Sequence, residues 1–170
     1  MYYFFSASLP ELRPGETPPM TPAEFDADAE LQLSPRHYRM MVDGDPASRV
    51  HREMRRFEEY LRTRIAEKRA EKLKLPIDLP EPEAFYGEVD AALGQFSQLD
   101  PAERERAVDR LRWKMLDELT WSSEFDFDHI CAYRMKLRLA EKYRGRDAKS
   151  GRKSFDDAVR AMTEHQRVHR

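Results

Sequence analysis

Few residues in this sequence have the types and spacing that catalysis requires. Cys131 lies two positions from His129, but residues i and i+2 of a helix do not face each other, so the two cannot act as nucleophile and base. The apolar neighbours of Cys131 favour a buried, unreactive thiol. The sequence has no Gly-rich phosphate loop, Gly-x-Ser-x-Gly elbow or His-Glu-x-x-His motif. We therefore expect no catalytic residues, and an enzyme is the least favoured of the function classes.

Metal-binding residues are equally sparse. His165 and His169 are four apart and could chelate a metal from one helix face, but no third ligand accompanies them. Two cations near a helix C-terminus also interact favourably with the helix dipole. Asp126 and Asp128 lie at a predicted helix start, where N-capping and interaction with the helix dipole account for both carboxylates without a metal or catalysis. The aspartate pair at 156–157 is interpreted in the same way. The sequence therefore predicts no metal site and no cofactor.

Basic side chains form two groups that could bind a partner. One group lies on a long predicted helix and the other follows Cys131. Such groups could contact nucleic acid, anionic lipid or an acidic protein; they could also be solvated helix faces with pairs such as Arg49–Glu53. Because neighbouring segments are acidic, a solvated face or a protein partner is favoured over nucleic acid. The residues expected to contact a partner are Arg52, Arg55, Arg56, Arg62, Arg134, Lys136 and Arg138.

The net charge of -2 conceals four blocks of alternating sign. Residues 1–48 carry -5, residues 49–75 carry +5, residues 76–131 carry -9 and residues 132–170 carry +7. Alternating blocks suggest that acidic and basic elements face each other, or face charged protein partners. A nucleic-acid-binding protein usually has net basic character, which this chain lacks.

Composition predicts a single helical domain over residues 1–170. One cysteine in 170 residues excludes an internal disulfide framework and indicates a reducing compartment. The longest apolar run, at residues 1–5, is too short for a membrane span and lacks the features of a signal peptide, so we expect a cytoplasmic protein. Six glycines argue against a turn-rich β fold. The expected fold class is all-α: a helical bundle with short N-terminal helices.

Prolines after good N-cap residues predict several helix starts. Thr21-Pro22 and Asp100-Pro101 are each followed by a Glu that completes a capping box, and Ser34-Pro35 and Asp45-Pro46 give two more starts. The sequence predicts these helices: 22–33, 35–41, one long basic helix at about 46–74, 83–93 with Gly94 as a left-handed cap, 100–119, 127–144 and 154–165. Residues 2–9 could be a strand or a helix, residues 75–82 form a Pro-rich connector, and the basic tail 166–170 is expected to fray.

Helical periodicity also predicts the core. The long helix carries an apolar stripe of Val50, Met54, Phe57, Leu61 and Ile65. The stripe lapses after Ile65, before the further apolar residues Leu73 and Leu75. Other helices have apolar faces of their own. Expected core residues are Phe57, Leu61, Met115, Leu116, Ile130 and Leu137. The aromatic residues at positions 2–5 could belong to the core or form a docking patch, and burial is the favoured alternative.

Two separate stretches of the sequence carry a family resemblance. The first runs through Tyr2-Tyr3-Phe4, Ala7-Ser8-Leu9-Pro10-x-Leu12, Pro18-Pro19-Met20-Thr21 and Glu24-Phe25. The second comprises Phe125-x-Phe127-Asp128, Ala132-Tyr133-x-Met135-Lys136-Leu137 and Gly151-x-x-x-Phe155. Together they resemble an uncharacterised family encoded in bacterial V/A-type ATPase gene clusters. That family looks like a shortened relative of the helical funnel protein that joins the central stalk of the ATPase to its membrane ring. The motifs are not catalytic and imply no active-site residues.

This resemblance implies a function through protein–protein contacts. The expected protein is a non-catalytic accessory or central-stalk-like component of a proton- or sodium-translocating V/A-type ATPase, with stalk or rotor subunits as partners. It would meet the membrane only through the ATPase complex and would bind no small-molecule substrate. The alternative is a helical module that binds nucleic acid, or proteins in general, through the basic long helix.

Overall fold

A computed structural model describes residues 2–122 and 125–142 of the chain. Within these residues the fold is all-α, as expected, with seven α-helices, one 3-10 turn and no strand. The elements are α1 (Tyr3–Ser8), α2 (Pro22–Gln32), α3 (Pro35–Asp43), α4 (Arg49–Leu73), α5 (Gly87–Gly94), η1 (Phe96–Gln98), α6 (Pro101–Thr120) and α7 (Phe127–Glu141). The helix expected at 154–165, the tail 166–170 and the two histidines at 165 and 169 lie outside the described residues.

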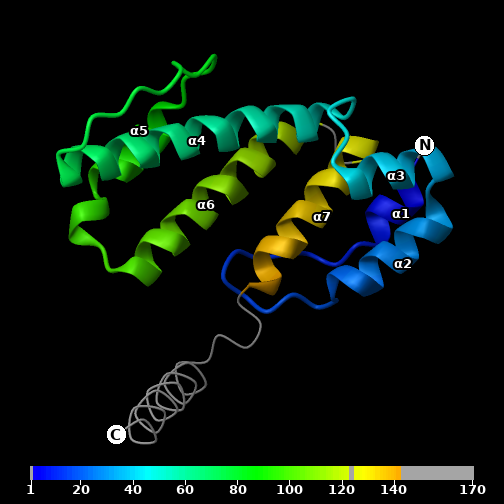
Figure 1. Ribbon diagram of the computed structural model, residues 1–170. Helices are drawn as coiled ribbons and strands as arrows, with labels where there is room; N and C mark the ends of the chain where they lie inside the picture. Colours follow the sequence, from blue (N-terminus) through cyan, green and yellow to red (C-terminus); the bar gives the residue numbers. More distant parts are fainter. Residues whose placement is uncertain (1, 123–124, 143–170) are drawn as a thin grey trace, which may run out of the picture.

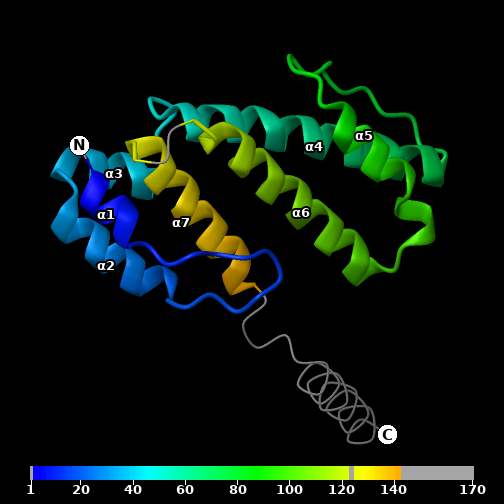
Figure 2. The ribbon, with the colours of Figure 1, turned by 180° about the vertical axis from the view of Figure 1, so that it is seen from behind.

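Helix α7 is the centre of the arrangement. It contacts α2, α3, α4 and α6. Figure 1 shows α4 lying across one end of α6 and α7, which run from it side by side, with α1, α2 and α3 beyond α7. The reverse view in Figure 2 shows α5 beside the far end of α4, close to the start of α6. The second half of α4, α5 and α6 therefore form one end of the molecule, and α1–α3 form the other.

The predicted capping boxes are present at two helix starts. Glu24 N–H donates to Thr21 Oγ1 (3.1 Å) and Thr21 N–H donates to Glu24 Oε2 (2.7 Å) at the start of α2. Asp100 and Glu103 make the same reciprocal bonds before α6. In α4 the expected start at Asp45-Pro46 is wrong, because Ser48 is the N-cap, while Asp45 Oδ1 accepts Ala47 N–H (2.8 Å) in a turn.

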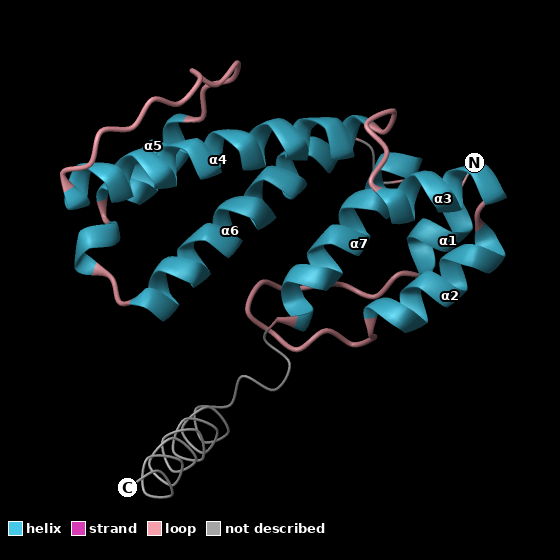
Figure 3. Cartoon of the chain, viewed as in Figure 1, coloured by secondary structure: helices cyan, strands magenta, loops and turns pink. Residues whose placement is uncertain are grey.

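The long basic helix is present as α4, over 25 residues. Val50, Met54, Phe57 and Leu61 of the predicted stripe are buried. The stripe lapses after Ile65, and Leu73 and Leu75 beyond it are exposed. Figure 3 shows the segment after α4 as an irregular connection, which agrees with the connector expected at residues 75–82.

Helix α5 begins later than the sequence predicts. It starts at Gly87 rather than at residue 83, because the preceding chain is held by its aromatic rings. The Tyr86 ring packs against Phe57 (centroids 5.3 Å apart) and Tyr60 (5.4 Å apart). Gly94 is the last helical residue and not a left-handed cap; the left-handed glycine that caps a helix is Gly44, at the end of α3.

The core confirms most of the predicted residues. Phe57, Leu61, Leu116, Ile130 and Leu137 are buried, and Met115 packs partly buried against them. The N-terminal segment forms a helix: Phe5 is buried and stacks on Phe25 with ring centroids 5.8 Å apart. Phe4 is 87% exposed, so the aromatic residues at positions 2–5 divide between core and surface.

Candidate interaction groove

Ion pairs between helices account for much of the alternating charge. Most of these pairs join residues of different charge blocks, but Lys114 and Glu88 lie in the same block. Pairs that join different helices are Arg64–Asp90, Arg112–Glu58, Lys114–Glu88, Arg134–Asp26, Lys136–Asp117 and Lys142–Asp109. The basic residues left without such partners are therefore the ones to consider for binding.

Four of the seven residues expected at a partner surface are paired within the protein. Arg134 is 6% exposed and holds Asp26 by two hydrogen bonds, Nε–Oδ1 at 2.6 Å and Nη2–Oδ2 at 2.8 Å. Lys136 binds Asp117, and Arg52 and Arg56 both bind Glu53 beside them on α4. Burial and the α2–α7 ion pair make Arg134 a structural residue, which corrects its assignment to the surface.

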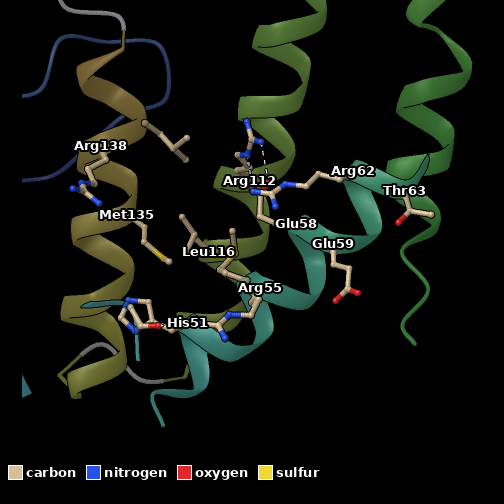
Figure 4. Close-up of a pocket in the computed structure, with 13 residues that line it drawn as sticks. His51, Arg55, Glu58, Glu59, Arg62, Thr63, Arg112, Leu116, Met135 and Arg138 are labelled. Carbon is tan, nitrogen blue, oxygen red and sulfur yellow. Dashed lines mark hydrogen bonds and ion pairs between the residues drawn. The ribbon is translucent and has the colours of Figure 1, made fainter. Parts of the chain in front are cut away.

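The other three expected residues line one groove. Arg55 and Arg62 on α4 and Arg138 on α7 line the groove, and in Figure 4 the Arg138 side chain extends over α7 on the side away from α4. All three are exposed. Arg55 donates only to the Gly44 carbonyl (3.4 Å), and neither Arg62 nor Arg138 has an ion-pair partner among the described residues. The structure thus brings together arginines from two distant charge blocks of the same sign.

The groove lies between α4, α6 and α7 and has a volume of about 820 Å³. Its base is apolar. The base residues are Met54, Leu116, Met135 and Leu139. Gly44 and His51 lie at one end, and Glu59 and Thr63 complete the α4 side. An apolar base between cationic rims suits a ligand that is itself apolar on one face and acidic at its margins.

Arg112 is a groove residue that the sequence did not single out. It lies in the most acidic block, and only the folded chain brings it against Glu58. Its Nε and Nη2 donate to the two Glu58 oxygens (2.5 and 3.0 Å), and its Nη1 donates to Asp109 (3.0 Å). Hydrogen bonding to Glu58 raises the pKa of Arg112, with burial opposing the rise. Because Glu58 and Arg112 neutralise each other, the positive excess of the groove comes from Arg55, Arg62 and Arg138.

The titratable groups near the groove are not arranged for proton or acyl transfer. Burial is the largest effect on His51 and lowers its pKa, and Arg134 lowers it further. The His51 Nδ1 atom is buried with no hydrogen-bond partner. Burial raises the pKa of Cys131 to about 12, which leaves essentially no thiolate at neutral pH. Burial therefore disfavours the charged forms of both His51 and Cys131.

The described part of the chain offers neither a metal cluster nor a membrane-spanning helix. Over residues 2–122 and 125–142, no three His, Cys, Asp or Glu side chains cluster in a way that could hold a metal ion. Among the same residues, no helix combines the length and the apolar character that crossing a bilayer requires.

The fold and groove define a small all-helical protein with a cationic, apolar-based surface groove. The chain belongs to the family described as protein of unknown function (DUF2764), whose sequence model matches residues 58–166. The match includes α4 from residue 58 onward and all of α5, α6 and α7, whereas the groove residues Gly44, His51, Met54 and Arg55 lie before it. No curated protein and no solved structure is significantly similar to the chain.

Proposed function

We propose that this protein is a non-catalytic accessory component of a V/A-type ATPase that binds an acidic segment of a partner subunit in the groove between α4, α6 and α7. The observation that carries the binding mode is that Arg55, Arg62 and Arg138 line one groove with an apolar base and have no acidic partner among the described residues. Exposed arginines recognise carboxylates bidentately, and two methionines in the base adapt to irregular apolar surfaces.

The shape of the groove favours a helical segment as its occupant. Its walls are helices, and an amphipathic helix that lies in such a groove places apolar residues on the base and acidic residues at the rims. A segment of this kind is acidic overall, and is complementary to the three rim arginines. The ion pairs within the described part of the protein use many of its basic side chains but not these three arginines, so they remain available for an acidic partner.

Support for an ATPase partner comes from the two motif stretches that carry the resemblance. Their described parts, residues 2–25 and 125–137, lie far apart in the sequence but are in contact in the fold. Tyr133 of the second stretch donates its hydroxyl to the Pro10 carbonyl of the first (2.9 Å), and that hydroxyl also approaches Met20 Sδ (3.8 Å). This contact makes the described parts of the two stretches one structural unit; the ATPase partner itself is inferred from the resemblance. The relation to the helical funnel protein and the place in the central stalk are part of the same proposal.

A nucleic-acid partner is less well supported. The chain is net acidic, and Glu59 lines the same groove as the three arginines. Most of the other basic side chains of α4 bind neighbouring carboxylates, so no continuous basic track follows the helix.

The test is binding of the tagged protein to the purified V/A-type ATPase of its native host. We expect the wild-type chain to bind, and Arg62→Glu with Arg138→Glu to lower the affinity by about tenfold or more, because rim charges become repulsive. The matched control is Arg36→Glu with Arg110→Glu, which reverses two exposed arginines outside the groove.

Three outcomes would count against the proposal. Absence of wild-type binding would remove the ATPase partner. Equal weakening by both double variants would show that binding depends on the overall charge of the protein and not on the groove. Salt-dependent binding of duplex DNA at comparable affinity would favour the nucleic-acid alternative.

A further inference from the structure

The connector between α4 and α5 exposes a row of large apolar side chains. Leu73, Leu75, Ile77, Leu79 and Phe85 are between 38% and 77% exposed. They account for five of the eleven exposed large hydrophobic residues in the described chain. Because proteins rarely leave large apolar side chains gathered in solvent, such a segment marks an interaction site. Connections of this length without regular structure are usually functional.

Prolines favour an extended conformation in the connector. Pro76, Pro80 and Pro82 each bias the preceding residue toward the β or polyproline region. Lys74 is the one non-glycine residue with a positive φ in the described chain, so the segment that follows it makes no left-handed turn. Figure 1 shows the segment leaving the end of α4, running back beside the helix and returning to α5. Little further ordering is needed for this segment to bind as a strand.

The two edges of this extended segment differ. In a strand, the backbone N–H and C=O groups of successive residues point to opposite edges. The even-numbered edge carries Pro76, Pro80 and Pro82, which have no N–H. The odd-numbered edge carries the amides of Ile77, Leu79 and Glu81, and no backbone hydrogen bond uses them in the described structure. Only the odd-numbered edge can therefore pair with another strand.

The side chains favour pairing as well. Leu75, Ile77 and Leu79 would lie on one face of a strand because side chains alternate between faces. Residues 76–86 contain three acidic residues and no lysine or arginine. Exposed sheet edges commonly carry lysine, so the charge of the connector complements them. The prolines are four and two residues apart, which is not the Pro-x-x-Pro spacing of polyproline ligands.

We propose that residues 75–82 add to the exposed edge of a β-sheet in the partner protein, pairing through their odd-numbered edge with a strand flanked by basic residues. The inference rests on the proposed function, since the partner is a component of a V/A-type ATPase. The prolines on the outer edge end the sheet at this strand, so the pairing cannot propagate into aggregation. The connector and the arginine groove are then two separate contacts with the ATPase.

Two proline substitutions test this pairing. Glu81→Pro and Asp78→Pro each remove one exposed carboxylate and add one proline, and neither native side chain makes a hydrogen bond or ion pair in the described structure. Only Glu81→Pro removes a donor from the odd-numbered edge. In full-length chains we expect Glu81→Pro to weaken binding to the purified native-host ATPase by about fivefold or more, and Asp78→Pro to change it less than twofold.

The outcomes separate this inference from the proposed function. If the wild-type chain fails to bind the ATPase, the proposed function and the strand pairing both fall. If it binds and Glu81→Pro binds equally well, or Asp78→Pro weakens binding as much, strand pairing alone is overturned. Ile77→Ser gives a second measurement. If Ile77 lies on the apolar face that contacts the partner, this variant should bind the ATPase more weakly than the wild type, and unchanged binding would overturn the assigned register. Unaltered circular dichroism melts for each variant confirm that the fold is intact.

Discussion

Burial, rather than a catalytic partner, is the largest effect on the pKa values of Cys131 and His51. Cys131 lies in the core among apolar residues, and this environment raises the pKa of its thiol to about 12. His51 lies at the start of α4, where burial lowers its pKa. A raised thiol pKa and a lowered imidazole pKa both follow from the cost of placing charge in an apolar environment. Neither residue is prepared for catalysis.

His51 gives the folded protein a predictable pH dependence. Its folded pKa lies below the usual value of 6.5, so as the pH falls the unfolded chain takes up a proton before the folded protein does. The free energy of unfolding is therefore at its full value above about pH 7 and decreases as the pH falls through the folded pKa. His51→Gln should reduce this decrease between about pH 7 and pH 5.5 in denaturant melts. An unchanged slope in the variant would show that other groups control it.

At the residue scale, the sequence identified only part of the candidate site. Arg55, Arg62 and Arg138 were expected at a partner surface and line the groove. Arg134 was expected there too, but its partner Asp26 is 108 positions away, and no local pattern reveals such a pair. Arg112 was missed for the same reason, since its partner Glu58 is 54 positions away. Whether a basic side chain is free depends on tertiary contacts that spacing alone does not contain.

At the scale of elements, local chemistry predicted the helix starts better than the helix ends. The two capping boxes involve residues three apart, so the sequence contains everything they need. The start of α4 was placed too early because Asp45 and Ser48 are both good N-cap residues. The turn at residues 45–48 determines which of the two caps the helix. The start of α5 depends on the contacts of Tyr86 with α4, which are not local.

The end of α4 offers a stabilising substitution. Lys74 caps the helix in the left-handed region with φ of 54°, a conformation that favours glycine. Lys74→Gly should therefore raise the free energy of unfolding by about 0.5–1 kcal/mol, because the strain of a β-carbon disappears. Chemical denaturation of both proteins measures the change. Lys72→Gly, within the last turn of the helix, should lower stability by a similar amount.

At the scale of the molecule, one core joins all the helices, so a cavity anywhere in it should affect the whole fold. Leu61 of α4 and Leu116 of α6 are fully buried in that core. Leu116→Ala or Leu61→Ala should lower the free energy of unfolding by about 2–5 kcal/mol. Leu31→Ala is the control, because Leu31 is exposed and its loss should change stability by less than about 0.5 kcal/mol. A core variant that loses less than about 1 kcal/mol would show that the helix faces are assigned wrongly.

The central position of α7 has a consequence for how the chain is made. The residues that α7 holds in place come from the beginning of the chain: Tyr133 binds Pro10, and Arg134 binds Asp26. A ribosome completes α1, α2 and α3 long before it reaches residue 127, and until then Phe25 and Asp26 lack their α7 partners Tyr133 and Arg134. Helices α1, α2 and α3 cannot complete their packing until α7 has been synthesised, as in other folds with contacts between distant residues. During synthesis, the segment that contains α1, α2 and α3 is therefore the part of the chain that chaperones would bind.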